Sequence, residues 1–186
     1  SMSPSSHTLI VLDISRSMLA TDIDPDRITA AKSTIHTFLT EKNTEHIWLI
    51  LFAGKPFLSV PFTLDHTGLR SITDNVSPYS IRQELPGLSW TAIWDSLFLG
   101  IEAFSGIITE QKNIILLTDG RFNIGIDPRK ILPEAVQRNI RIFTVGIWTL
   151  TWGTIPGWGV YEWTGSTWLD ESLLMDIADQ TGGKYF

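Results

Sequence analysis

Four short, nearly continuous apolar runs dominate the sequence and restrict the folds that it can adopt. They cover residues 8–13, 46–52, 113–118 and 141–147. Runs of this length and composition are typical of strands that are buried on both faces. The amphipathic segments between them predict helices over residues 24–39, 65–76, 91–108, 127–139 and 170–180. This alternation predicts an α/β fold of three layers, with a mostly parallel central sheet and helices on both faces.

One further strand is expected at an edge of the sheet. Residues 57–62 are flanked by Pro56 and Pro61, and proline cannot donate a hydrogen bond to a neighbouring strand. Because only a short turn over residues 53–55 separates this segment from the preceding run, we expect an antiparallel edge strand.

Composition and charge narrow the class of protein. The 186 residues carry a net charge of -6, which argues against nucleic acid as the main partner, and they include no cysteine, which excludes disulfides and thiolate metal sites. No apolar stretch approaches the roughly 18 residues of a membrane span. We expect residues 1–7 to be a leader or linker and residues 8–186 to form a single domain.

The first apolar run leads directly into the motif Asp13-Ile14-Ser15-Arg16-Ser17. In open α/β sheets, ligands bind at the carboxyl ends of the strands, where this motif would lie. A carboxylate and two hydroxyls form an oxygen-only donor set, suited to Mg²⁺, Mn²⁺ or Ca²⁺. A helix-capping role for Asp13 or Ser15 is an equally good explanation of the motif taken alone.

Two other residues are expected at the same edge of the sheet. Asp119 follows another apolar run and precedes Gly120, so it is either a turn residue or a second acid of the site. Thr91 opens a predicted helix, where it could cap the helix or face the first motif. Asp22 and Asp95 lie close enough in sequence to these positions to orient the ligands, but helix entry explains Asp22 better and a solvated helix position explains Asp95 equally well. Convergence at one edge favours a single cation site over separate caps and turns.

These motifs in this order resemble the von Willebrand factor A domain, over nearly the whole chain. The resemblance implies a Rossmann-like fold and a metal-ion-dependent adhesion site (MIDAS) that holds one divalent cation, Mg²⁺ or alternatively Mn²⁺ or Ca²⁺. It implies that Ser15, Ser17 and Thr91 coordinate the cation through their hydroxyls. Asp13 and Asp119 would bind it directly or through water, and an acidic residue of a protein partner would complete the site.

The sequence is more specifically similar to the bacterial Bat-type (Bacteroides aerotolerance) subfamily. The similar segments are residues 17–23, 25–28, 30–32, 52–54, 61–65 and 181–186. The resemblance implies a periplasmic domain anchored to the bacterial inner membrane by flanking helices outside this chain. It also implies partners among other Bat-type proteins or a MoxR-type AAA ATPase system. Two departures are Arg16 between the serines and Ser89-Trp90 before Thr91, where the family usually has glycine. Trp90 would either narrow the site or form a wall on one side of it.

A segment rich in tryptophan and glycine, residues 148–168, follows the last apolar run and therefore lies at the same edge. It contains five of the eight tryptophans. Long loops in compact domains are usually functional or disordered, and tryptophan is enriched at interface hot spots. We expect this insertion, with Trp90, to contact a partner, although plain packing would also explain the composition. The candidate contact residues are Trp90, Trp152, Trp158 and Trp163.

Three functions are compatible with these features. The first is a metal-dependent protein-binding module without enzymatic activity. The second is a metal-assisted hydrolase or phosphotransferase that uses Asp13, but no histidine falls in the predicted site loops to act as a general base. The third is an interaction domain that binds through the tryptophan-rich segment without a metal.

Overall fold

A five-stranded sheet forms the centre of the molecule. The structure is a computed structural model that describes residues 6–80, 91–121, 123–149, 153–155 and 170–186. The strands are β1 (Ser6–Asp13), β2 (His46–Phe52), β3 (Pro56–Thr63), β4 (Gln111–Thr118) and β5 (Ile140–Gly146), in the order β3-β2-β1-β4-β5. All neighbouring strands are parallel except β2 and β3, which pair antiparallel. The predicted edge strand is therefore confirmed.

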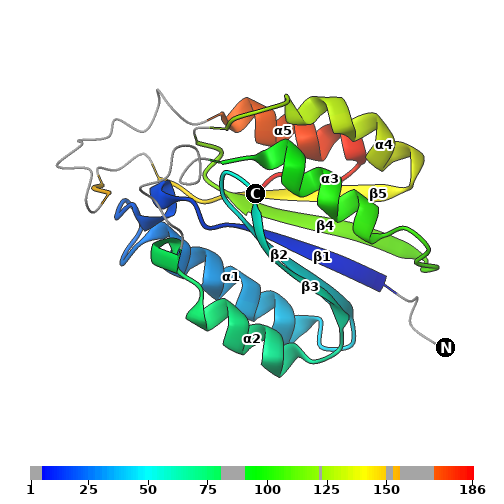
Figure 1. The fold of residues 1–186 in the computed structure, drawn as a ribbon, viewed down its shortest axis with the longest axis horizontal. Helices are drawn as coiled ribbons and strands as arrows, with labels where there is room; N and C mark the ends of the chain where they lie inside the picture. The colour runs from blue at the N-terminus through cyan, green and yellow to red at the C-terminus, as the bar shows by residue number, and fades with distance from the viewer. Residues whose placement is uncertain (1–5, 81–90, 122, 150–152, 156–169) are drawn as a thin grey trace.

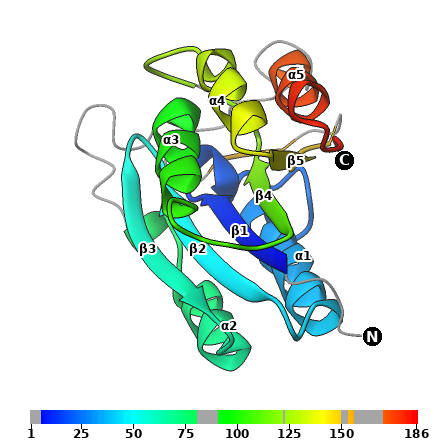
Figure 2. The same cartoon turned by 90° about the vertical axis from the view of Figure 1, so that its right-hand side faces the viewer.

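Helices cover both faces of this sheet (Figures 1 and 2). One face carries α1 (Arg27–Glu41) and α2 (His66–Asn75), and the other carries α3 (Ile93–Ala103), α4 (Leu132–Gln137) and α5 (Glu171–Thr181). Short 3-10 helices, η1 (Arg16–Leu19), η2 (Pro78–Ser80) and η3 (Pro128–Ile131), lie in the connections. This arrangement confirms the predicted three-layer α/β class. None of the helices in the described ranges is both long and apolar enough to cross a membrane.

Burial on both faces explains why the strand sequences are nearly continuously apolar. In β1, Leu9 and Val11 belong to the core beneath α3 and α5, whereas Ile10 and Leu12 belong to the core beneath α1. All four side chains are almost fully buried. The alternation of a strand places successive side chains on opposite faces, so a central strand covered on both sides needs apolar residues at every position.

Several boundaries differ from the predictions. Helix α1 begins at Arg27 and not at residue 24, because Asp26 is its N-cap and accepts a hydrogen bond from the Thr29 N–H. Strand β1 begins at Ser6, inside the segment expected to be a leader or linker. The helix expected over residues 91–108 begins at Ile93 and ends at Ala103. It ends early because Gly106 adopts a left-handed conformation (φ 76°) that a helix does not accommodate. The helix expected over residues 127–139 is divided into η3 and α4.

The carboxyl ends of the parallel strands lie together at one edge, on the left in Figure 1. There β1 ends at Asp13 and β4 ends at Thr118, immediately before Asp119. Parallel pairing of β1 with β4 aligns Leu12 with Leu117. The register thus brings the loops that follow these two strands to the same place.

Candidate metal centre

Three hydroxyl groups from two distant segments meet at this edge. Ser15 Oγ lies 3.2 Å from Ser17 Oγ, and Thr91 Oγ1 donates to Ser15 Oγ at 3.3 Å. Ser15 follows β1, Ser17 lies in η1, and Thr91 precedes α3. All three residues are buried. The hydroxyl separations exceed the 2.7–2.8 Å of a good O–H···O hydrogen bond, so these groups satisfy one another only weakly.

Neither of the alternative capping roles describes these hydroxyls. Ser15 stands at the N-cap position of η1 but its side chain makes no capping hydrogen bond. The N-cap of α3 is Ala92, not Thr91, because the predicted helix begins two residues later than expected. The Thr91 hydroxyl instead contacts Ser15, so Thr91 faces the first motif and does not cap the helix.

Asp13 stabilises the loop after β1 through two hydrogen bonds. Its Oδ1 accepts a hydrogen bond from the Ser15 backbone N–H at 2.8 Å, and its Oδ2 accepts one from Thr118 Oγ1 at 2.6 Å. Burial raises the pKa of Asp13 to about 7, and the nearby Asp119 carboxylate adds to this, while the hydrogen bonds from Ser15 and Thr118 oppose it. A cation bound nearby would stabilise the ionised form of this buried carboxylate and lower its pKa.

Asp119 is a turn residue, as one of its two interpretations predicts. It precedes a turn in which Gly120 has φ 66°, and its Oδ1 accepts a hydrogen bond from the Arg121 backbone N–H at 3.0 Å. Its Oδ2 accepts a hydrogen bond from Arg27 Nη1, also at 3.0 Å. Asp119 is fully buried and close enough to Asp13 to raise its pKa, and its role as a second acid of the site stays a prediction.

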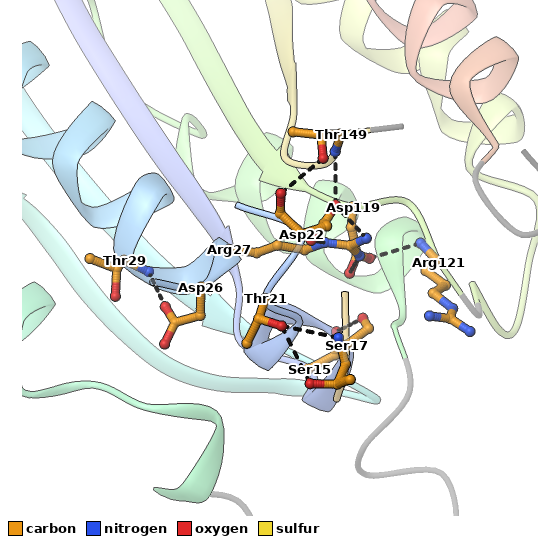
Figure 3. A network of polar contacts seen from close by, with 11 residues as sticks. Ser15, Ser17, Thr21, Asp22, Asp26, Arg27, Thr29, Asp119, Arg121 and Thr149 are labelled. Carbon is orange, nitrogen blue, oxygen red and sulfur yellow. Dashed lines mark hydrogen bonds and ion pairs between the residues drawn. The ribbon is translucent and has the colours of Figure 1, made fainter. Parts of the chain in front are cut away.

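Arg27 is a member of this centre that the motif search did not single out. Asp26 caps α1 by accepting a hydrogen bond from the Thr29 N–H at 2.9 Å, which places Arg27 in the first turn. The guanidinium contacts Asp22 through two hydrogen bonds, of 2.6 and 3.0 Å, as well as Asp119 (Figure 3). Arg27 lies four residues before Ala31 and thus continues the buried stripe of α1. A charge at a core position of an amphipathic helix is the signal that could have revealed it.

Asp22 contacts Arg27 and also the segment after β5, rather than the hydroxyls directly. Its Oδ2 accepts a hydrogen bond from the Thr149 backbone N–H at 2.8 Å, and its backbone carbonyl accepts one from Thr149 Oγ1 at 2.9 Å. Thr21 and Thr154 add a pair of hydrogen bonds, with the N–H of Thr21 donating to the Thr154 carbonyl at 3.1 Å and the N–H of Thr154 donating to Thr21 Oγ1 at 3.0 Å. The segment after β5 is thereby joined to the loop after β1.

Of the remaining predicted residues, the structure describes Asp95 but not the four tryptophans. Asp95 is exposed on the first turn of α3, with its carboxylate beside Gly125. Trp90, Trp152, Trp158 and Trp163 lie outside the described residues, as does most of the predicted insertion. Trp148, at the start of that insertion, is half-buried against the core and stacks on Tyr185 with ring centroids 6.5 Å apart. For Trp148, packing is therefore the better explanation.

The donor set fits a hard divalent cation. Within the described ranges, no three His, Cys, Asp or Glu side chains form a metal-binding group, so hydroxyls would supply the nearest ligands. The separations of 3.2 and 3.3 Å between their oxygens are close to the roughly 3 Å between adjacent oxygens around Mg²⁺. Ser15, Ser17 and Thr91 could hold such an ion, with Asp13 and Asp119 supplying negative charge behind them.

Comparison with solved structures supports the likeness to Bat-type proteins. An aerotolerance-related membrane protein from Bacteroides fragilis aligns with a TM-score of 0.83 and 26% identity, covering 98% of this chain and 90% of that chain. BatB from Bacteroides thetaiotaomicron aligns with a TM-score of 0.82 and 27% identity, covering 97% of this chain and 89% of that one.

Sequence comparison places the chain in a family. A UPF0353 protein from Mycolicibacterium paratuberculosis is 27% identical over 185 residues, which cover 96% of this chain and 54% of the relative. The chain thus spans about half the length of the curated relatives that it matches. The family profile described as the von Willebrand factor type A domain matches residues 8–121, which include all five residues of the candidate site. The chain belongs to the von Willebrand factor type A domain family, and its structural neighbours include Bat-type proteins.

Proposed function

We propose that this domain binds a protein partner through a divalent cation held at the hydroxyls of Ser15, Ser17 and Thr91. The observation that carries the proposal is the approach of Thr91 to Ser15, 76 residues apart in the chain, with their oxygens within 3.3 Å. An open coordination position would accept a carboxylate of the partner, because Mg²⁺ prefers six oxygen ligands and retains exchangeable waters. Asp13 and Asp119 would stabilise the cation by their charge.

Mg²⁺ is the proposed cation, with Mn²⁺ or Ca²⁺ as alternatives. Hydroxyl and carboxylate oxygens suit these hard ions and give no preference for thiophilic metals. When bound, the cation would supply a positive centre for the partner's acidic side chain. The chain's own residues would hold it without taking part in bond-making or bond-breaking.

A binding role is favoured over catalysis by what surrounds Asp13. Both carboxylate oxygens are already engaged by Ser15 and Thr118, and the residue is fully buried, which disfavours nucleophilic attack. All four histidines are described, and they lie in β1, α1, β2 and α2 away from the hydroxyls. Among the described residues, no histidine is therefore placed to act as the general base of hydrolysis or phosphoryl transfer, and the carboxylates of the centre would be needed to hold the cation.

The cellular setting of the proposal comes from the similar proteins. Because one structural neighbour is an aerotolerance-related membrane protein and another is BatB, we propose that the domain serves a Bat-type stress or assembly system. It would be anchored at the bacterial inner membrane with this domain in the periplasm. Its partners would be other Bat-type proteins or a MoxR-type AAA ATPase system, contacted also through Trp90 and the insertion over residues 148–168.

Calorimetric titration with MgCl₂ tests the metal site. The parent domain should bind one equivalent, and the double variant Ser15→Ala/Ser17→Ala should lose at least about tenfold in affinity because two ligands are removed. Ser33→Ala is the matched control, since Ser33 is an exposed serine of α1. Equal binding by the parent and the double variant would contradict the assignment.

Partner capture tests the binding role separately. The immobilised domain should retain a protein from a membrane extract of its source in Mg²⁺, release it in EDTA, and fail to retain it as the Ser15→Ala/Ser17→Ala variant. Retention that survives EDTA but is lost in Trp158→Ala/Trp163→Ala would favour metal-free binding. Hydrolysis of a phosphate ester by the parent that disappears in Asp13→Asn would favour an enzyme.

A further inference from the structure

Arg27 provides a permanent positive charge inside the candidate metal centre. Its side chain is about 3% exposed, and it forms ion pairs with Asp22 at 2.6 Å and with Asp119 at 3.0 Å. Removing a guanidinium and two carboxylates from water is costly unless they compensate one another. Arg27 thus compensates the charge of two acidic side chains that are buried at this edge.

Arg27 also competes for the charge that a bound cation would use. The carboxylate of Asp119 has two oxygens, of which Oδ2 accepts from Arg27 and Oδ1 from the Arg121 backbone. A divalent cation beside the hydroxyls would be attracted by Asp119 and repelled by the Arg27 guanidinium. Each nearby unit of charge should change the affinity for the cation, because a buried site screens charges less than water does.

Asp22 determines how much of the Arg27 charge remains uncompensated. It meets the guanidinium with both carboxylate oxygens, a bidentate geometry that arginine favours. It is held in this position by Thr149, whose backbone N–H donates to Asp22 Oδ2 at 2.8 Å. Figure 3 shows Asp22 and Asp119 both directed at the Arg27 guanidinium. Loss of the Asp22 charge would remove the bidentate partner of Arg27 and leave the ion pair between Arg27 and Asp119.

We propose that Arg27 is an internal counter-ion that limits how tightly the centre binds a divalent cation, and that Asp22 offsets this effect. Both residues act through the charge of Asp119 and are not ligands themselves. The inference rests on the proposed function, since it concerns the affinity of the same cation site.

Two single variants should move the Mg²⁺ affinity in opposite directions. Arg27→Met removes a positive charge and should tighten Mg²⁺ binding by roughly tenfold, whereas Asp22→Asn removes a negative charge and should weaken it by roughly tenfold. Calorimetry at low ionic strength measures both, and the differences should shrink in added KCl. Arg138→Met is the matched control, because Arg138 forms exposed ion pairs with Glu102 and Glu134.

A double variant keeps the test decisive if Arg27→Met fails to fold. Asp22→Asn/Arg27→Met has the same net charge as the parent and leaves fewer buried charges uncompensated than Arg27→Met does. Its Mg²⁺ affinity should return to within about threefold of the parent. If Arg27→Met is unfolded by circular dichroism in EDTA, the recovery of affinity between Asp22→Asn and the double variant replaces it as the measurement.

The outcomes separate this inference from the proposed function. Weakened binding in both single variants, or no recovery in the double variant, would mean that the two residues act only by supporting the fold, and would overturn the inference alone. A parent domain that binds no Mg²⁺ would overturn the proposed function as well.

Discussion

Asp13 connects the stability of the metal-free domain to its capacity to bind a cation. Burial and the neighbouring Asp119 raise its pKa to about 7, well above the roughly 3.9 of an aspartate in an unfolded chain. A raised aspartate pKa means that the folded state binds the proton more strongly. The contribution of protonated Asp13 to the free energy of unfolding is therefore fully present below pH 4 and is lost as the pH rises through about 7.

The variant Asp13→Asn should accordingly stabilise the metal-free domain at pH 8. Asparagine is uncharged at every pH, and its amide can bond to Thr118 Oγ1 in place of the carboxylate. We expect a gain of about 2 to 4 kcal/mol in the free energy of unfolding at pH 8 and little gain at pH 4, together with weaker Mg²⁺ binding. Urea unfolding in EDTA at both pH values measures the difference. An equal effect at pH 4 and pH 8 would mean that ionisation of Asp13 is not the cause.

His7, at the other end of the sheet, contributes to stability with a pH dependence opposite to that of Asp13. It stacks on His46 with ring centroids 4.6 Å apart and contacts Phe62 edge-on. Burial lowers its pKa, the charge of His46 adds to this, and Glu45 partly opposes it. Because the unfolded state takes up the proton more readily, the contribution of His7 is present above about pH 6.5 and is lost as the pH falls.

The variant His7→Gln should therefore make stability less sensitive to pH between 6.5 and 5. The effect should stay below about 1 kcal/mol, since His7 is only partly buried and solvent screens the interaction. Thermal unfolding of the parent and the variant across this range is the measurement. A parallel decrease in both proteins would assign the pH dependence to another group.

At the scale of elements, the loop after β1 and the segment after β5 depend on each other. Gly153 approaches the backbone of Asp22 so closely that a Cβ at this position would collide with the Asp22 nitrogen. Only glycine permits this approach without displacement of one chain. The hydrogen bonds of Thr21 with Thr154 and of Asp22 with Thr149 rely on the same contact.

The variant Gly153→Ala should separate these two segments. We expect a loss of about 1 to 3 kcal/mol in stability from the steric conflict. The amides of Thr21 and Thr149 should also exchange with deuterium faster, because their acceptors are on the opposite segment. Thr154→Ser, which keeps the hydroxyl and the backbone, should change neither. Unchanged protection of both amides in Gly153→Ala would contradict the packing.

At the scale of the whole molecule, cation binding should add to the stability of the fold. The hydroxyls join the end of β1 to the start of α3, so a cation held there would link segments that separate on unfolding. At a Mg²⁺ concentration 100 times the dissociation constant, linkage contributes about 2.7 kcal/mol. For a domain of this size, the melting temperature should rise by about 5 to 10 °C.

Differential scanning calorimetry in MgCl₂ and in EDTA tests this expectation. The increase should vanish in Ser15→Ala/Ser17→Ala and persist in Ser33→Ala. An equal increase in the double variant would assign the stabilisation to ions bound elsewhere on this acidic chain.

Much of the architecture could be predicted from local patterns, because those patterns reflect burial. The apolar runs of β1, β2, β4 and β5 indicate strands covered on both faces, and the two prolines within β3 indicate an edge strand. Helix ends were less accurate. Thr91 is a favourable capping residue, yet α3 begins at Ile93, whose backbone N–H donates to the Asn123 side chain at 3.1 Å, so a residue distant in sequence replaces the local cap. Such a contact is not visible in the neighbouring sequence.

The candidate site, like the fold, could be predicted only in part from the sequence. Residue types and strand ends were sufficient to identify Asp13, Ser15, Ser17, Thr91 and Asp119 as one candidate set, since parallel strands deliver their carboxyl ends to one edge. The role of Arg27 depended on tertiary structure, because it lies 92 residues from Asp119 and no local pattern relates the two. Burial converts that distant pair into a strong interaction, and burial of a charged residue is a property of the folded chain.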